Sequence, residues 1–349
     1  MSASDSIPDL SESWWRSLKN SRARQRVAAA LQGGAVDRAL GLIKRWEKQG
    51  GGAEAERWRY QALVEAGRWE EAWKWAKRCR KTDGPSWRTR ESAALKKMAA
   101  AALAAGRVVP LEGLEGVERH VPGVTELDGR ALHFSDGPSV HAAWREIYGQ
   151  RIYDFAADGA PRIIDGGANV GLATLRMKRL FPQARLTCVE ADPTVADCLR
   201  KNLEAAGHAD VEVLQAALWE HAEGISFARE GSDAGHVEEG GADSERVPSV
   251  TLSSLLKEPV DLLKLDIEGA ERVVLREAAP HLHRVQRLFV EYHSYAGQTQ
   301  DLPELLVLLR DAGFRISLLM PDAISPRPFE EVRTSVGMDL RVNVFGTRK

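Results

Sequence analysis

The stretch Pro161-Arg-Ile-Ile-Asp-Gly-Gly-Ala-Asn-Val-Gly171 decides how the second half of this chain folds. Its apolar start is typical of the end of a buried strand, which Asp165 closes with a carboxylate. The three glycines that follow allow a tight turn and a close approach of the backbone to a ligand. Apolar residues at helical spacing then predict a helix over residues 170–181, which Pro182 ends. The segment therefore predicts a strand, a turn and a helix around a nucleotide-type pocket.

The spacing of these glycines argues against one common class of nucleotide site. They fall as G-G-x-x-x-G around Ala168, whereas the dinucleotide fingerprint is G-x-G-x-x-G. A nicotinamide-dependent oxidoreductase is therefore disfavoured, while a glycine turn of some other nucleotide-binding protein stays open. The pattern D-x-G-x-N-x-G over residues 165–171 instead resembles the S-adenosylmethionine site of class I methyltransferases.

The next strand, predicted over residues 186–190, ends in an acid. Glu190 lies 19 residues after Gly171, and roughly 20 residues is the spacing expected of an acid that binds ribose hydroxyls. Asp192 can cap the free N–H groups of the following helix, and Pro193 suits its first position. We therefore expect Glu190 to hold the ribose of a cofactor; the alternative is an ordinary surface acid.

The remaining predicted strands also end in small or charged residues. In chain order these are Ala216 and Ala217 after residues 211–214, then Asp266, Glu268 and Glu271 after a strand that begins at Val260, then Glu291 and His293 after residues 288–290. Open parallel sheets bind ligands at the carboxyl ends of their strands. The small residues leave room for a flat adenine ring, and the charged ones are expected to line the site.

Five segments together resemble the FkbM family of methyltransferases. They are residues 165–171, 190–193, 250–255, 264–271 and 291–293, within a match that runs from about residue 121 to the C-terminus. The element K-x-D-x-E-G-x-E over residues 264–271 is the most distinctive of them. The resemblance implies a class I, Rossmann-like α/β fold with a doubly wound, seven-stranded sheet. It also implies S-adenosylmethionine as methyl donor and usually a hydroxyl oxygen as acceptor, often on a sugar, a glycan or a natural product.

The resemblance and the strand ends together give a set of expected site residues. Those expected to bind the cofactor are Asp165, Gly167, Asn169, Gly171, Glu190, Ala191, Asp192, Ala216, Ala217 and Asp266. A hydroxyl acceptor must lose its proton, so a general base is useful. We expect His293 to be that base, because histidine titrates near neutrality. Asp266 and Glu268 are expected to orient it, to hold sugar hydroxyls or to attract the sulfonium.

Several functional alternatives stay open on the sequence alone. Asp266, Glu268 and Glu291 could hold Mg²⁺, which prefers oxygen ligands, but no further dedicated ligand is evident and we expect no metal. The acceptor could be the nitrogen of a peptide or amine instead of an oxygen. The chain could also be a non-catalytic protein that senses the cofactor and docks partners through a helical module, although its intact acids argue against this.

The composition indicates a globular protein without a membrane span. The chain has 349 residues, 44% of them hydrophobic, which suggests two or three domains. No apolar run approaches 18 residues, and the first residues lack the features of a signal peptide. Cys79, Cys188 and Cys198 lack metal-site spacing and fit a reducing cytosol, the latter two as buried filler. A cytoplasmic location is therefore expected.

The first 109 residues differ from the rest in charge and pattern. They carry 22 Lys and Arg against 12 Asp and Glu, a balance of +10, whereas the remainder carries −12. Strand signals are absent, and helices are predicted over residues 12–105. Residues 34–40 are echoed 33 residues later by 67–73, a period near that of tetratricopeptide helix pairs. The basic half could meet a protein or an anionic partner, or simply pack; no nucleic-acid reader is indicated.

These patterns divide the chain into three parts. Residues 1–106 are expected to form an all-α, tetratricopeptide-like domain, 107–160 a linker with a lead-in β-hairpin and helix, and 161–349 the methyltransferase domain. Aromatic residues at 144, 148 and 153 could cover the cofactor or only pack. The Gly-rich, acidic stretch 231–245 could gate the acceptor or only connect strands.

Overall fold

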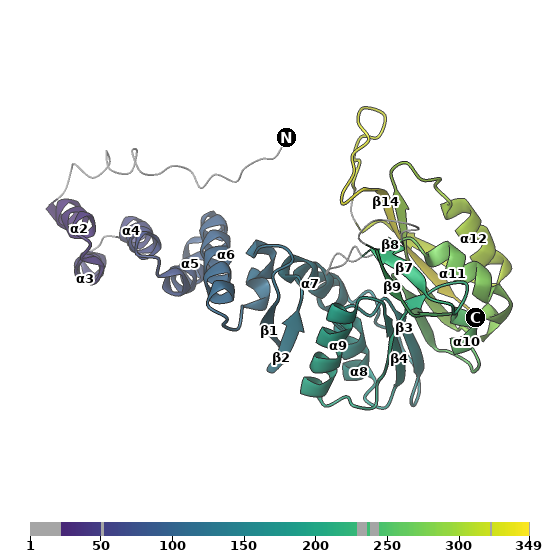
Figure 1. Ribbon diagram of the computed structural model, residues 1–349. Helices are drawn as coiled ribbons and strands as arrows, with labels where there is room; N and C mark the ends of the chain where they lie inside the picture. Colours follow the sequence, from purple (N-terminus) through teal and green to yellow (C-terminus); the bar gives the residue numbers. More distant parts are fainter. Residues whose placement is uncertain (1–21, 50–51, 229–235, 238–243, 322, 349) are drawn as a thin grey trace. The chain divides into compact units, whose positions relative to one another are not determined.

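The computed structural model describes residues 22–49, 52–228, 236–237, 244–321 and 323–348 (Figure 1). The chain separates into two compact units, Met1–Ala104 and Ala105–Lys349. Each unit has its own buried core, and we describe the units one at a time. Among the described helices, none is both long and apolar enough to cross a membrane.

The first unit is entirely helical in its described part. Its helices are α2 (Arg22–Gln32), α3 (Val36–Lys48), α4 (Gly52–Glu65), α5 (Trp69–Asp83), the short 3₁₀ turn η2 (Pro85–Trp87) and α6 (Arg88–Ala104). The helices predicted over residues 12–105 are confirmed from residue 22 onward. Residues 12–21 lie outside the described part of the chain.

The 33-residue echo corresponds to two helix pairs with the same turn. Gly34 between α2 and α3 and Gly67 between α4 and α5 both have a left-handed φ, +69° and +66°. In each turn the next residue donates its N–H to the carbonyl five residues earlier, at 2.8 and 2.9 Å. Ala39 and Ala72, which also correspond, are both fully buried. The sequence repeat is thus a structural repeat, while its tetratricopeptide character stays a prediction.

Several tryptophans of this unit serve packing between helices. Trp58 and Trp87 are buried; the first meets Trp46 edge-on at 6.0 Å and the second meets Tyr60 in the same way at 5.9 Å. Trp75 is half-buried and lies under the guanidinium of Arg59 at 4.4 Å. Trp58 and Trp87 therefore contribute to the cores between the helices.

The second unit is built on a seven-stranded sheet. In spatial order its strands are β13 (Arg315–Leu319), β14 (Met338–Thr347), β12 (Arg287–Tyr295), β11 (Leu262–Leu265), β3 (Arg162–Gly166), β4 (Arg185–Glu190) and β5 (Glu212–Gln215). β14 is antiparallel to both neighbours, and the other adjacent pairs are parallel. The strand order reverses between β3 and β11, which is where such sheets bind ligands.

Helices cover the sheet on both faces. α8 (Leu172–Leu180) and α9 (Pro193–Ala206) follow β3 and β4, whereas α11 (Glu271–Ala278), the 3₁₀ turn η5 (Ala279–Arg284) and α12 (Leu302–Asp311) follow β11 and β12. Right-handed crossovers that run in opposite directions from the switch point place these two sets on opposite faces (Figure 1). The expected class I, doubly wound α/β fold is confirmed.

The core of this unit follows from the apolar runs in the sequence. All four residues of β11 are buried, and Ile163, Ile164 and Cys188 on the neighbouring strands are fully inaccessible. Apart from Lys264 these residues are apolar, as expected of strands that are covered on both faces. Cys188 is thus the predicted buried filler, whereas Cys198 on α9 is only half-buried.

The lead-in segment before β3 contains the predicted hairpin. Its elements are η3 (Leu111–Gly116), the antiparallel strands β1 (Gly123–Leu127) and β2 (Arg130–Phe134), α7 (Gly137–Trp144) and the π-helical turn η4 (Arg145–Gln150). Asp136 caps α7 by accepting a hydrogen bond from the Ser139 N–H at 3.0 Å. This cap fixes where α7 starts, and α7 supplies one wall of the site.

A small insertion lies between β5 and β11. β6 (Ala217–Leu218) pairs with β10 (Ser249–Val250), which leads into α10 (Leu252–Leu255), while β7 (Ile225–Ala228), β8 (His236–Val237) and β9 (Ser244–Val247) form a three-stranded sheet. The stretch proposed to gate the acceptor, residues 231–245, falls mostly outside the described residues.

Candidate active site

The glycine turn after β3 is shaped first by its protein neighbours. Gly167 has φ +71°, and a Cβ there would lie 1.7 Å from the backbone oxygen of Asp266. Gly171 has φ +94°, and its Cβ would lie 2.6 Å from the side chain of Leu199. Both positions therefore require glycine even without a ligand. The expectation that these glycines serve the approach of a ligand is thus incomplete, since strand and helix packing already demand them.

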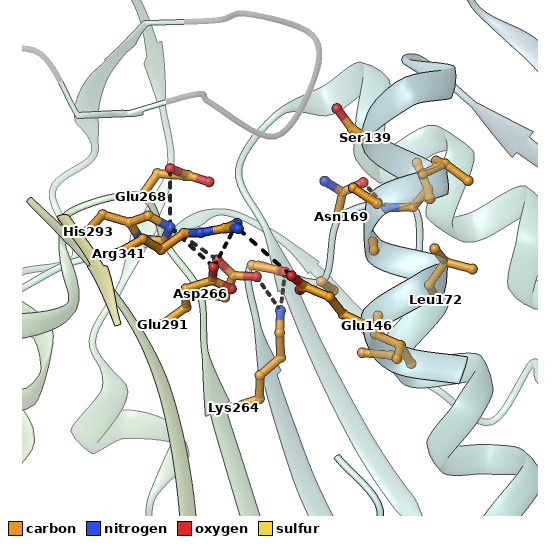
Figure 2. A pocket seen from close by; sticks show the side chains of 18 of the residues that line it. Ser139, Glu146, Asn169, Leu172, Lys264, Asp266, Glu268, Glu291, His293 and Arg341 are labelled. Atoms are coloured by element: carbon orange, nitrogen blue, oxygen red, sulfur yellow. Dashed lines mark hydrogen bonds and ion pairs between the residues drawn. The ribbon is translucent and has the colours of Figure 1, made fainter. Parts of the chain in front are cut away.

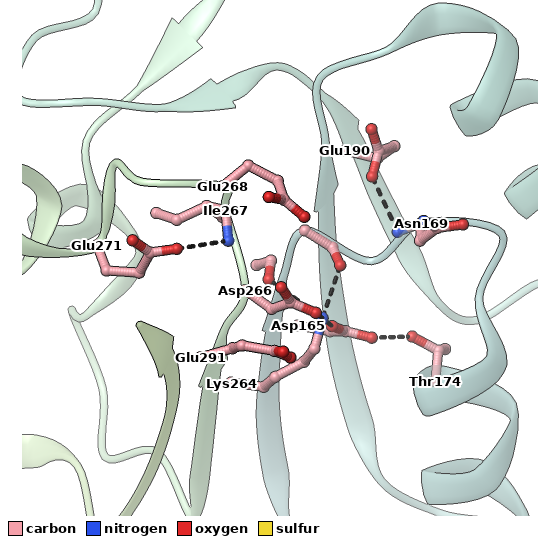
Figure 3. Close-up of polar contacts among 12 residues, drawn as sticks. Asp165, Asn169, Thr174, Glu190, Lys264, Asp266, Ile267, Glu268, Glu271 and Glu291 are labelled. Atoms are coloured by element: carbon pink, nitrogen blue, oxygen red, sulfur yellow. Dashed lines mark hydrogen bonds and ion pairs between the residues drawn. The ribbon is translucent and has the colours of Figure 1, made fainter. Parts of the chain in front are cut away.

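A buried lysine joins the turn to the neighbouring strand. Lys264 on β11 donates from Nζ to the carbonyl of Gly167 at 2.6 Å and lies 3.2 Å from Asp165 Oδ1 and 3.5 Å from Asp266 Oδ2 (Figure 3). Burial opposes its charge, but the two carboxylates outweigh burial and raise the pKa of Lys264. Asp165 also accepts from Thr174 Oγ1 at 2.7 Å. Asp165 is fully buried and holds the lysine and the turn in place, while its predicted contact with the cofactor stays a prediction.

Glu190, the expected ribose ligand, supports the same turn from β4. Its carboxylate accepts the N–H of Asn169 at 2.8 Å (Figure 3). It also accepts the N–H of Asp192 at 2.9 Å. Asn169 has a left-handed φ of +50°, and its Oδ1 accepts the N–H of Val170 at 2.6 Å. Burial raises the pKa of Glu190 to about 7, against these backbone hydrogen bonds, which lower it.

The other residues expected around the adenosine lie beyond Glu190. Asp192 is buried and caps α9, accepting from Thr194 N–H at 2.7 Å and Val195 N–H at 3.2 Å, as its sequence position predicts. Ala216 and Ala217 are both 5% exposed at the end of β5 and in β6, and Ala191 is half-buried. These small residues stand at the same sheet edge as Glu190.

A pocket opens at the carboxyl ends of β3, β11 and β12, roofed by α7 (Figure 2). Its cavity is about 140 Å³, smaller than the roughly 300–1,000 Å³ of ligand pockets. The polar residues that line it are Ser139, Glu146, Asn169, Lys264, Asp266, Glu268, Glu291, His293 and Arg341. The residues expected to bind the adenosine, Glu190, Ala191, Ala216 and Ala217, do not line it. The strand-end pocket therefore covers one side of the predicted site, and the adenosine residues lie outside it.

His293 and Glu291 reach this pocket from within a strand. The strand predicted over residues 288–290 extends to Tyr295, because β14 pairs with β12 along its whole length. The parallel partner β11 has its last pair at Val290, so residues 291–295 continue past it. The expectation that β12 ends before Glu291 is therefore wrong, yet both side chains lie at the switch-point edge.

A tight turn after β11 presents Asp266 and Glu268. Glu268 and Gly269 both have left-handed φ values, +53° and +97°. The Glu271 carboxylate closes the turn by accepting the N–H groups of Ile267 at 3.2 Å and Gly269 at 3.1 Å (Figure 3). A left-handed glutamate is strained, and such strain persists only where its surroundings hold it. Glu271, expected among the strand-end acids, thus holds the turn from inside.

Glu271 also fixes the imidazole of His293. His293 Nδ1 lies 3.0 Å from Glu271 Oε1, and both side chains are almost inaccessible. Nε2 therefore faces the pocket, where Asp266 Oδ1, Glu268 Oε2 and Glu291 Oε1 lie 4.0, 3.8 and 3.9 Å from it (Figure 2). Each of these distances is too long for a direct hydrogen bond.

These carboxylates overturn one expectation about His293. Burial would lower its pKa, but Glu268, Glu271 and Asp266 together raise it to about 10. These carboxylates favour the protonated imidazole, so the titration near neutrality expected from the sequence does not hold for the ligand-free site. Burial raises the pKa of both Glu268 and Glu291 to about 8.

Sequence reasoning missed several residues of the pocket, among them Arg341 and Glu146. Arg341 on β14 lies 3.1 Å from Glu291 Oε1 and 3.8 Å from Glu146 Oε1, and Glu146 belongs to η4. Tyr153, raised only as a covering or packing aromatic, is buried against Phe289 and also lines the pocket. No motif marks Arg341 or Glu146, because only the completed sheet brings β14 and η4 to this edge.

Comparison with known proteins connects this geometry to an activity. Residues 165–316 match the family model of the methyltransferase FkbM domain. Methyltransferase sdnD of Sordaria araneosa is 28% identical over 238 residues, which cover 57% of this chain and 91% of that protein. Methyltransferase 1 of Beauveria bassiana is 27% identical over 213 residues, covering 52% and 84%. The chain is a methyltransferase.

The matched segment of the methyltransferase includes the glycine turn, Glu190, the turn after β11 and all of β12. It begins after the helical unit, which it does not include. Among solved structures, methyltransferase FkbM from Methylobacillus flagellatus KT aligns with a TM-score of 0.38 and 14% identity, over 60% of this chain and 54% of that one.

Proposed function

We propose that this methyltransferase uses S-adenosylmethionine to methylate a hydroxyl oxygen of a sugar, a glycan or a natural product. One observation carries the proposal: the glycine turn, Glu190 and the strand-end pocket occupy adjacent places on one sheet edge. The residues fit such a cofactor. Glu190 offers a carboxylate for the ribose, Ala191, Ala216 and Ala217 leave space for the adenine, and the turn over residues 167–171 meets the methionine part.

The acceptor is proposed to enter the strand-end pocket. Transfer forms a bond between the acceptor oxygen and the methyl carbon and breaks the carbon–sulfur bond, whose electron pair stays on sulfur. The enzyme must hold the acceptor oxygen in line with that bond. Asp266, Glu268 and His293 converge on the space where this oxygen would lie. We propose that His293 and Glu268, whose side chains lie side by side, take the hydroxyl proton, and that Asp266 positions the acceptor.

The proposal is tested by incubating the full chain with methyl-labelled S-adenosylmethionine and panels of hydroxyl and amine acceptors. Label on oxygen supports the proposal, and label only on nitrogen favours the amine or peptide alternative. Calorimetry with the cofactor and its demethylated product gives a second readout. Binding without any transfer across the panels would favour a cofactor-sensing protein, and tight NAD binding in place of S-adenosylmethionine would overturn the assignment.

A further inference from the structure

The strand-end pocket holds more negative than positive charge. Among its described residues and their direct partners, the carboxylates are Glu146, Asp165, Asp266, Glu268, Glu271 and Glu291, and the permanent cations are Lys264 and Arg341. Carboxyl groups therefore outnumber the permanent cations. Buried charges are normally paired or coordinate metals. The pocket therefore favours an additional cation.

One point in the pocket has the donors for such a cation. Asp266, Glu291 and His293 each offer one ligand atom, and these three atoms lie within 4.8 Å of one another. Glu291 Oε1 is buried and forms an ion pair with Arg341 Nη1 at 3.1 Å, but it accepts no hydrogen bond from the part of the chain that the structure describes. His293 Nε2 faces the same space, since Nδ1 is occupied by Glu271. An imidazole held by a carboxylate through its other nitrogen is typical of a metal ligand.

The spacing suits a small divalent ion. Ligand atoms about 2.1 Å from an octahedral ion lie roughly 3 Å apart when adjacent and about 4.2 Å apart when opposite. His293 Nε2 lies 4.0 Å from Asp266 Oδ1 and 3.9 Å from Glu291 Oε1. Only one of these oxygens can lie opposite the nitrogen in an octahedral site, so at least one carboxylate must close to about 3 Å when the ion binds. Asp266 keeps 27% of its side chain exposed, so it has freedom to move inward.

We propose that Asp266, Glu291 and His293 bind one small divalent cation of the Mg²⁺ or Mn²⁺ class. The role of this ion in methyl transfer rests on the proposed function. Its presence would differ from the metal-free transfer expected from the sequence. That expectation considered only carboxylates, because the sequence could not place the free nitrogen of His293 among them. The cation would occupy the space between the three side chains and take the acceptor oxygen as a further ligand.

Such an ion would make the acceptor hydroxyl more acidic. A bound divalent cation polarises a coordinated oxygen and lowers the pKa of its proton. The acceptor hydroxyl would pass that proton to Glu268, whose carboxylate lies beside the proposed ligands. His293 would bind the ion through Nε2, since a histidine ligand must be neutral at the nitrogen that binds. The bonds formed and broken in methyl transfer are unchanged.

The test uses Mn²⁺ as the probe, added to the full chain after chelator treatment and without cofactor. Electron paramagnetic resonance should show one saturable Mn²⁺ per chain. Pulsed spectra should show coupling to an imidazole nitrogen, and His293→Gln should abolish it. Glu291→Gln and Asp266→Asn should weaken binding at least by the roughly 10–100-fold that even an outer-shell change costs.

The matched control is Glu190→Gln, the same isosteric change at a half-buried acid that does not line the pocket. It should leave Mn²⁺ affinity within about three-fold, since it removes no ligand. Absence of saturable Mn²⁺ binding to the unaltered chain, or binding insensitive to Glu291→Gln, overturns the metal site. Because no cofactor is present, this failure is separate from failure of the proposed function. Cofactor binding and transfer that persist in excess chelator would leave the proposed function standing and remove the metal from it.

Discussion

Glu190 shows how one side chain can serve both the fold and the cofactor. Its carboxylate holds the N–H groups of Asn169 and Asp192 and is proposed to receive the ribose hydroxyls as well. Glu190→Ala should weaken the binding of S-adenosylmethionine and of its demethylated product by about 1–3 kcal/mol, because buried polar groups lose their acceptor. Calorimetry measures both affinities. Glu190→Gln keeps one acceptor oxygen and should lose less; equal affinity in all three proteins would remove Glu190 from the site.

The same carboxylate predicts a pH dependence near neutrality. The pKa of Glu190 is about 7, raised by burial from its ordinary 4.5. The ionised form is the stronger acceptor, so cofactor affinity should rise by about ten-fold from pH 6 to pH 8, following the ionised fraction. Without cofactor the sign is opposite: ionising a buried acid costs folding free energy, so this contribution falls as pH rises from about 4.5 to about 7. Cofactor affinity measured by calorimetry from pH 6 to pH 8 should not change with pH in Glu190→Gln. A pH dependence of the affinity that persists in this variant would show that another group titrates.

At the scale of the element, the turn after β3 depends on its contact with β11. Gly167→Ala would place a Cβ 1.7 Å from the Asp266 carbonyl as well as in a left-handed conformation. Gly207→Ala is the matched control, because Gly207 has a similar φ of +76° and no atom within 4 Å of the added Cβ. Gly207→Ala should lower the free energy of unfolding only by the roughly 1–2 kcal/mol that a left-handed conformation costs a residue with a Cβ. Gly167→Ala should lower the free energy of unfolding, measured with denaturant, clearly more than Gly207→Ala does. Similar losses in the two variants would show that the backbone of the turn can shift to make room for the Cβ.

The strands and turns of the site were predictable from the sequence to different degrees. The strands, the glycine turn and the acids at the strand ends were predictable, since apolar runs and turn residues are local signals and parallel strands end at one edge. The surroundings of His293 were not. Its position inside β12 depends on pairing with β14, and its raised pKa depends on carboxylates from another strand and turn. Arg341 and Glu146 escaped prediction for the same reason, because their place in the pocket is set by tertiary packing alone.

At the scale of the whole molecule, the helical unit is the part whose purpose needs a direct test. Its charge balance is +10 over residues 1–109, against −12 for the remainder, and its two equivalent helix turns mark it as a repeat module. We predict that it recruits or selects the acceptor and takes no part in methyl transfer, because the proposed cofactor and acceptor residues all belong to Ala105–Lys349.

Deleting Met1–Ala104 separates recruitment from mere support. Recruitment predicts a folded remainder that binds the cofactor with unchanged affinity but turns over its acceptor less efficiently. If the acceptor is anionic, the full chain should lose that advantage as salt rises, since exposed charges more than about 10 Å apart are largely screened at 0.1 M ionic strength. Melting temperature, calorimetry and acceptor turnover at two salt concentrations give the three readouts. An unstable remainder would instead make the helical unit a structural support, and a remainder as stable and as active as the full chain on its true acceptor would contradict both roles.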